Sequence, residues 1–575
     1  MLSAYEKFIR EAMRRRIFSQ AGLKKLKRQI AREFKIDTPR TDKIRDFYRR
    51  MIKTGKMKEC RRLLQALVLK RTRTLSGVSV VAVLTRDYPC GSDCLYCPEE
   101  KQMPKSYLSN EPAVMRAIRL DFSPYWQMNK RLEVLEYNGH DVSKVELIVM
   151  GGTFSHLPKI YQYWFIKECF RGANEYTGLD NKEKFKKIKE PFSKGKDFEK
   201  LNILRRELDK EKRKNIKAGC RIVGLTLETR PDAVTITELK RFRELGCTRV
   251  EIGAQSIYGK VLKKNRRGHG RQAIIRATAY LKEMGFKINY HIMPGLLGSN
   301  LKMDEAMFLE LFSCADFRPD MLKIYPCVVT KEADLYDLWK RGKYAPYTNK
   351  QLAGLLARIK RRIPQYVRIA RLIRDIPTVS IKAGPNIPNL RDVLKSKGVK
   401  CRCIRCREAG RSLVVSCGGK KEKIFLDRLD YRASGGKEIF LQFVSGKEKR
   451  LHAFLRLRIP AFVLARKEAR GRRRALGLGA KKAPEKELAG CGIIREVHSY
   501  GQVAPVGRKI KGTSQHRGFG KRLIRRAEKI TRDEFLLKKI AVIAACGTKD
   551  YYFGLGYKEE GNYMTKELFN KAKMF

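Results

Sequence analysis

Three cysteines, Cys90, Cys94 and Cys97, lie within one eight-residue stretch that directly follows a strand-like apolar run at 78–84. Thiolates are the usual protein ligands of iron–sulfur clusters, and three from one loop can hold three irons of a four-iron cluster while the fourth iron stays open. A zinc ion is the main alternative, but it would normally take a fourth ligand and none is obvious nearby. The spacing therefore favours a [4Fe-4S] cluster over zinc and over buried, inert thiols.

A second group, Cys401, Cys403 and Cys406, has a spacing close to that of zinc sites. Its fourth ligand is not readable, and Cys417 and a histidine from elsewhere are both candidates. A disulfide framework is not expected, because a large intracellular chain keeps its thiols reduced. We expect a structural zinc ion here.

Near the C-terminus, Gln515, Gly518 and Gly520 form a glycine-rich turn that opens a helical pattern at 515–530. Backbone N–H groups at such a helix start can hold a pyrophosphate. Alone, this short pattern is weak evidence. A tyrosine pair, Tyr551 and Tyr552, follows in a stretch where aromatic core packing is the alternative to a catalytic role.

Strand-like runs separated by helical patterns must position the first cysteine group. Six of them predict a parallel α/β sheet, open or barrel-like. We expect this α/β domain to extend over 76–390, with a charged insertion near 180–218. A basic helical region, 1–75, precedes it. The rest, 391–575, holds the second cysteine group (about 398–420) and a strand, turn and helix. The six runs are 78–84, 144–150, 221–227, 248–253, 287–293 and 321–325.

The chain is strongly basic: 127 Lys and Arg stand against 60 Asp and Glu, a net charge of +67. A polyanionic partner is expected; a basic proteome or an acidic membrane surface are the alternatives. No apolar run approaches the roughly 20 residues that span a bilayer. Residues 1–16 carry two glutamates and no apolar signal-peptide core, so we expect a cytoplasmic protein.

The cysteine loop, followed by the strand end "MGGTF" at 150–154, resembles the radical S-adenosylmethionine superfamily. The resemblance implies that Gly151, Gly152 and Thr153 receive the methionine end of S-adenosylmethionine. Longer phrases such as "LTLETRPD", "TRVEIGAQSIY", "HIMPGLLGS" and "CRCIRCREAG" narrow it to the catalytic subunit of the Elongator complex and its stand-alone archaeal and bacterial relatives. This resemblance covers nearly the whole chain.

That family implies a partial (βα)6 radical barrel joined to a C-terminal GNAT acetyltransferase α/β domain, with zinc between the domains. The implied activity adds a carboxymethyl group to carbon 5 of the wobble uridine of tRNA. Acetyl-CoA is the two-carbon source, and a 5'-deoxyadenosyl radical activates the acetyl group. The implied partner is the anticodon stem-loop, with Elongator-type accessory subunits or a homodimer possible in addition.

Residue matching places acetyl-CoA contacts in both domains, and Tyr552, with Tyr551 beside it, where an acid would protonate the leaving thiolate. Lys144 is the contact in the radical domain, with an exposed strand-edge lysine as the alternative interpretation. The contacts in the C-terminal domain are Glu496, Val497, His498, Ser499, Gln515, Gly518, Phe519, Gly520 and Lys521.

Several positions depart from the family pattern, among them Glu99 and Glu100 after the last cluster cysteine, where the family has two glycines, and a cysteine loop one residue shorter. The others are Leu297, Ala545, Cys546 and Phe553. Two competing hypotheses remain: a protein lysine acetyltransferase on a non-catalytic radical-type platform, and an RNA-binding scaffold with a vestigial cluster loop. The basic charge argues against the first and the intact cysteines against the second.

Overall fold

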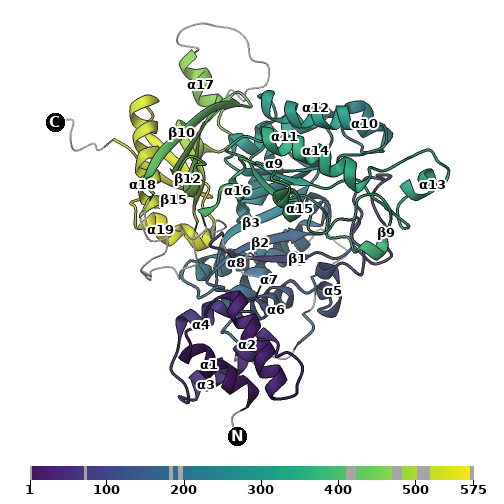
Figure 1. The fold of residues 1–575 in the computed structure, drawn as a ribbon. Coiled ribbons are helices and arrows are strands. Elements are labelled where there is room, and N and C mark those ends of the chain that lie inside the picture. Colours follow the sequence, from purple (N-terminus) through teal and green to yellow (C-terminus); the bar gives the residue numbers. More distant parts are fainter. Residues whose placement is uncertain are drawn as a thin grey trace.

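The structure is a computed structural model with three parts: N-terminal helices, a central parallel sheet wrapped by helices, and a C-terminal mixed sheet (Figure 1). The residues that it describes are 3–69, 74, 76–179, 185–188, 190–191, 198–409, 422–468, 482–500 and 518–569.

Four amphipathic helices form the N-terminal part, as the basic helical pattern predicts. They are α1 (Ala4–Arg14), α2 (Gln20–Glu33), α3 (Thr41–Lys53) and α4 (Arg61–Ala66). Their apolar faces, including Phe8, Ile30 and Tyr48, make a core of their own, while charged faces point outward. This part docks on the central part through a Leu69 N–H to Asn138 carbonyl bond of 3.1 Å.

The central sheet has seven parallel strands in the order β1-β2-β3-β4-β5-β6-β8, so β1 and β8 are unjoined edges of a partial barrel. The six predicted runs are all strands; the short β8 was not predicted. The strands are β1 (Ser79–Leu84), β2 (Lys144–Met150), β3 (Arg221–Thr229), β4 (Arg249–Gln255), β5 (Lys287–Ile292), β6 (Met321–Ile324) and β8 (Arg368–Arg371).

Helices cover the outer face of this sheet, as parallel sheets require. Among these helices are α5 (Pro112–Arg119), α6 (Pro124–Tyr137), α7 (Lys159–Asn174), α11 (Arg271–Glu283) and α14 (Asn349–Arg362). The charged insertion contains a further helix, α8 (Phe198–Asn215), which buries Leu204 and Leu208 in the main core.

The C-terminal sheet also has seven strands, in the order β10-β11-β12-β13-β14-β16-β15, antiparallel except for the β13–β14 pair. Helices α18 (Phe519–Lys529) and α19 (Lys549–Phe553) belong to this part. The strands are β10 (Ile424–Ala433), β11 (Gly436–Ser445), β12 (Arg450–Ile459), β13 (Cys491–Ser499), β14 (Lys539–Val542), β15 (Lys558–Glu560) and β16 (Tyr563–Glu567).

Strand β13 leaves its parallel partner halfway along. It pairs with β14 over residues 491–494 only, and a register irregularity against β12 falls at Arg495. The extra residue is a β-bulge, which bends a strand. Residues 496–499 therefore pair with β12 on one edge and diverge from β14 on the other.

Buried ion pairs join the central and C-terminal sheets. The Arg495 guanidinium donates to Asp320 (3.1 Å), which precedes β6, to Glu438 on β11 (2.8 Å), and to the Phe286 carbonyl (2.6 Å). All three charged residues are at most 1% exposed. Breaking such a set would leave uncompensated buried charge, so the domain contact is fixed. Within the described ranges, no helix is long and apolar enough to cross a membrane.

Candidate functional site

The first cysteine group lies in the loop after β1, at the carboxyl end of the central strands. A turn closes between the Cys97 N–H and the Cys94 carbonyl (3.0 Å), and Leu95 bonds to Asn265 and Leu335 through its backbone. The three cysteines line a cavity of about 580 Å³ together with Gly152 and Thr153. The loop and the β2 end therefore share one cavity.

The two glutamates that depart from the family pattern have partners in this loop. Lys105 lies 3.0 Å from Glu99, and the Ser109 N–H donates to Glu100 at 2.8 Å. The two carboxylates thus bind the loop to the segment before α5. The three thiols, and not these carboxylates, line the cavity.

The three sulfur atoms at this loop are spread more widely than around a single ion. Cys401, Cys403 and Cys406 gather their sulfurs within 4.8 Å of one another, but the loop cysteines do not form such a group. Each thiolate of a four-iron cluster binds a different iron, whereas zinc draws all its ligands to about 2.3 Å. The donor set fits a cluster.

The surroundings of the loop shift the pKa values of two of the thiols in opposite directions. Burial raises the pKa of Cys94, but Arg267, with Nη1 3.4 Å from its sulfur, and the Ser92 hydroxyl at 3.3 Å outweigh it and lower the pKa overall. Burial raises the pKa of Cys97 to about 11. Cys90 Sγ lies 3.3 Å from the Thr153 hydroxyl.

A cradle for a ligand lies at the glycine pair after β2. Gly151 has φ +132°, and a Cβ there would lie 1.9 Å from the Thr85 hydroxyl oxygen. That oxygen is buried and has no hydrogen-bond partner in the described part of the chain. A buried polar atom normally has a partner, so this oxygen is open to one. The next residues, Gly152 and Thr153, line the cysteine cavity and suit the polar end of S-adenosylmethionine.

Sequence reasoning missed a polar cluster in the barrel. Glu251 accepts from His291 at 2.9 Å and pairs closely with Lys323, which also lies 3.4 Å from Glu228. These side chains line the same cavity as the cysteines. A signal was present: charged residues at alternate positions of "TRVEIG", "KINYHI" and "MLKI" face one side of strands buried on both faces.

Three of the predicted acetyl-CoA residues, Val497, Ser499 and Gly520, come together with Tyr551 at the bend of β13. A Cβ built on Gly520 would lie 3.1 Å from the Tyr551 hydroxyl, 3.8 Å from Ser499 Oγ and 4.0 Å from Val497 Cγ1. Gly518, with φ +71°, caps the start of α18. Only a small residue fits at 520, and free N–H groups at a helix start suit a pyrophosphate.

Side chains on β13 alternate between two faces. Val497 and Ser499 face Gly520, whereas Glu496 accepts from Arg456 (2.9 Å) and His498 Nε2 lies 2.6 Å from the Ser76 carbonyl oxygen. Because successive residues point to opposite sides, the side chains of Glu496 and His498 enter the domain contact. Only their backbone remains available to a cofactor.

The two tyrosines also differ in direction. Tyr551 is 37% exposed and reaches Gly520, while Tyr552 is 6% exposed and packs its ring 5.6 Å from that of Tyr557. Burial raises the pKa of Tyr551 to about 12, so its hydroxyl stays protonated at neutral pH. Tyr551 is better placed than Tyr552 to donate a proton at this site.

The remaining predicted contacts are dispersed. Phe519 is buried and packs 4.7 Å from Phe443, Lys521 is exposed on α18, and Gln515 lies outside the described residues. Lys144 is half-buried at the start of β2, paired in register with Arg221, which lies 3.4 Å from Asp550. Lys144 thus lies on the side of the barrel that faces α19.

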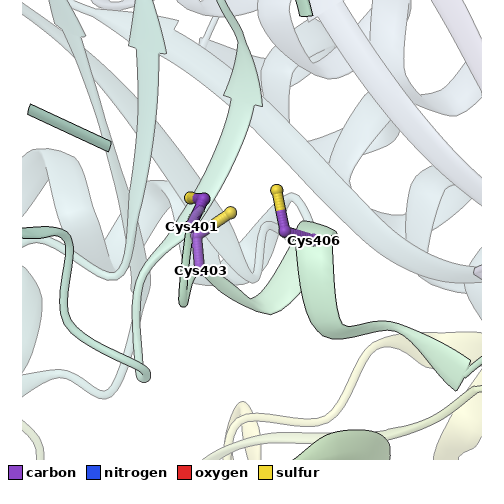
Figure 2. A group of neighbouring side chains, drawn as sticks. All are labelled: Cys401, Cys403 and Cys406. Carbon is purple, nitrogen blue, oxygen red and sulfur yellow. The ribbon is translucent and has the colours of Figure 1, made fainter. Parts of the chain in front are cut away.

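Cys401, Cys403 and Cys406 surround a common space with their sulfur atoms (Figure 2). The segment bridges both domains: Ile404 N–H donates to Val367 before β8 (2.9 Å), and Arg407 donates to Gln442 on β11 (3.0 Å). No fourth histidine, cysteine or carboxylate in the described residues joins this group, and Cys417 lies outside them. Three thiols at this spacing fit zinc.

Models of protein families match the Radical SAM superfamily at residues 89–310 and the Radical_SAM C-terminal domain at 319–398. The tRNA uridine(34) acetyltransferase of Methanocaldococcus infernus is 40% identical over 532 residues, 90% of this chain and 91% of that protein. Elongator complex protein 3 of Homo sapiens is 36% identical over 521 residues, 88% of this chain and 87% of that one. A solved structure, the archaeal M. infernus Elp3 with an N-terminal deletion, has a TM-score of 0.67 at 38% identity and covers 86% of this chain and 99% of that chain.

Proposed function

Because the chain belongs to the radical S-adenosylmethionine family of tRNA uridine(34) acetyltransferases and Elongator complex protein 3, we propose that it adds a carboxymethyl group to carbon 5 of the wobble uridine of tRNA. The chain is an enzyme of the acetyltransferase class that acts on this tRNA position. Its cofactors include a [4Fe-4S] cluster and S-adenosylmethionine. Acetyl-CoA as the carbon source is part of the proposal.

One observation carries the proposal: a single strand links the two sites. Gly151 and Gly152 follow β2 at the cysteine cavity, and Lys144 begins it beside the acetyltransferase domain. Seven residues of strand span about 20 Å. The two sites thus belong to one fixed unit, which supports the proposal that an acetyl group passes from one to the other.

The radical site would hold its group through Cys90, Cys94 and Cys97. When bound, the cluster would supply the electron that cleaves S-adenosylmethionine, giving a deoxyadenosyl radical that takes a hydrogen atom from the acetyl methyl group. Gly152 and Thr153, which line the cysteine cavity, would receive the methionine end, while Gly151 leaves room for the buried Thr85 hydroxyl behind them. The Glu251–Lys323–His291 cluster keeps the inner wall of the cavity polar for the nucleobase.

At the acetyl site, the chain supplies backbone donors and one acid. Residues 496–499 present the edge of β13 that β14 has left, which suits the amide groups of the pantetheine arm. The start of α18 would bind the pyrophosphate. When water adds to the thioester carbonyl and the carbon–sulfur bond breaks, the Tyr551 hydroxyl would protonate the departing thiolate of CoA, and the acyl group would leave as a carboxylate.

The basic surface supports an RNA substrate. A second cavity, of about 550 Å³, lies on the N-terminal helices and is lined by Arg15, Arg16 and Lys25. Phosphate contacts of this kind orient an RNA, and the base is read in a pocket. We assign the zinc ion at Cys401, Cys403 and Cys406 a structural role, and we retain accessory subunits or a homodimer and a cytoplasmic location as parts of this proposal.

The test is nucleoside analysis by mass spectrometry after anaerobic reaction of the iron–sulfur-reconstituted protein with tRNA, acetyl-CoA, S-adenosylmethionine and a reductant. We expect carboxymethyluridine at the wobble position and its loss in Cys94→Ala. Cys169→Ala, a buried cysteine far in sequence from both groups, is the control and should keep the product. Acetylated lysine in added protein substrates without any modified uridine would overturn the proposal.

A further inference from the structure

Arg267 is a buried cation against the first cysteine group. It is 6% exposed, and each of its donor atoms has a fixed direction. Nη2 donates to the Gly253 carbonyl (2.7 Å), Nε to His269 Nε2 (3.1 Å), and Nη1 lies 3.4 Å from Cys94 Sγ. In the part of the chain that the structure describes, this guanidinium has no carboxylate among its partners.

The most buried arginines elsewhere are neutralised differently. Arg456 and Arg495 both lie beside Asp320, and Arg458 pairs with Glu438 at 2.9 Å. Arg243 lacks a carboxylate but donates to three backbone carbonyls. Arg267 instead uses one donor on an imidazole and one on a thiol, so its charge needs an anion in the cavity.

The surroundings hold this guanidinium in place. A Cβ on Gly253 would lie 2.6 Å from Arg267 Nη2, so only glycine leaves room for it in β4. His269 accepts from Arg267 at Nε2, and burial and the neighbouring arginine lower the pKa of His269 to about 4. The imidazole is therefore neutral and adds no second positive charge.

Cluster ligation makes Cys94 a thiolate, which supplies the missing negative charge. A positive charge and an N–H donor close to a cluster sulfur favour the reduced form, since reduction adds negative charge. We propose that Arg267 raises the reduction potential of the [4Fe-4S] cluster through its contact with Cys94. The proposal rests on the cluster of the radical family and not on the tRNA substrate.

The test is a redox titration, monitored by electron paramagnetic resonance, of the full-length anaerobically reconstituted protein without S-adenosylmethionine or tRNA. In Arg267→Met we expect the ratio of reduced to oxidised cluster at a given potential to fall at least tenfold, a downward shift of about 59 mV for one electron. Arg267→Lys keeps the charge and should recover part of the shift. Arg266→Met removes a neighbouring exposed arginine, 57% exposed and paired with Asp334, and should leave the midpoint unchanged.

Iron and sulfide content must match the wild type in each variant. If Arg267→Met loads poorly, Gly253→Ala serves instead, because its methyl group displaces the guanidinium and should lower the midpoint in the same direction. A fully loaded Arg267→Met or Gly253→Ala protein with an unchanged or higher midpoint would overturn the inference. A midpoint shift in the variants, together with a wild-type protein that modifies no tRNA, would contradict the proposed function alone.

Discussion

Single side chains at the acetyl site divide by the face of the strand that carries them. Val497 and Ser499 approach Gly520 and Tyr551, while their neighbours Glu496 and His498 are bound into the domain contact. A match to the family motif assigns all four residues from 496 to 499 to acetyl-CoA binding without distinguishing them. The alternation of a β-strand separates those that can touch a cofactor with their side chains from those that cannot.

The tyrosine pair gives a direct comparison. Tyr551→Phe should lower the rate of thioester cleavage about 10²-fold, because the proposed proton donor is lost, with little change in acetyl-CoA affinity. Tyr552→Phe should keep most of the activity, since its ring packs against Tyr557 in the core. Release of CoA thiol, measured with a thiol reagent, checks both. Equal losses in the two variants would contradict this assignment.

The Arg495 ion pairs make a prediction about stability. Arg495→Met removes the cation that Asp320 and Glu438 share, so that Asp320 keeps Arg456 at 3.5 Å and Glu438 keeps Arg458 at 2.9 Å. The buried set then carries one positive charge fewer, which we expect to lower the free energy of unfolding by about 3–5 kcal/mol. Arg276→Met, at an exposed position of α11, should change it by less than about 0.5 kcal/mol. Urea unfolding followed by circular dichroism measures the two variants side by side. Similar values would show that the domain contact does not depend on this arginine.

At the scale of elements, periodicity and turn signals in the sequence located six of the seven strands of the barrel. The same signals did not predict β8, because its four residues "RIAR" look like part of a basic helix. The cysteine loop and the glycine pair were located because their chemistry is local in sequence. The Glu251–Lys323–His291 cluster was missed because its members come from three strands and meet only through the order and register of those strands in the sheet.

The segment with Cys401, Cys403 and Cys406 joins two domains, so metal removal should act on their junction. We expect about one zinc ion per chain by elemental analysis. Chelation, or Cys403→Ser, should lower the melting temperature of the acetyltransferase part, because Arg407 and Ile404 lose a fixed position between the sheets. Cys314→Ser, a half-buried cysteine outside the group, is the control. An unchanged melting temperature in zinc-free protein would refute the structural role.

The whole molecule carries a net charge of +67, which the barrel and acetyltransferase chemistry alone do not require. Some of this charge lies on the N-terminal helices, whose core is separate from the main core. A small cationic domain beside a deep cavity is suited to hold a folded RNA while one base enters the pocket.

The charge predicts a steep salt dependence of RNA binding. With six to ten phosphate contacts, the affinity for tRNA should fall roughly 10³ to 10⁵-fold between about 50 and 200 mM salt. Fluorescence anisotropy with labelled tRNA measures this slope. Arg15→Gln combined with Lys25→Gln should make it shallower, whereas Lys302→Gln, at an exposed position on the central part, should affect it less. A flat response of the wild type would remove the basis for the RNA partner.

The central claim is that the cysteine cavity and the acetyl site act on one acetyl group. The direct measurement is the reaction of reconstituted protein with tRNA, S-adenosylmethionine and acetyl-CoA that carries three deuterium atoms on its methyl group. We predict one deuterium in the 5'-deoxyadenosine and two in the carboxymethyluridine, both detected by mass spectrometry. Deoxyadenosine that forms without deuterium, while the modified uridine keeps its two labels or fails to appear, would contradict the account.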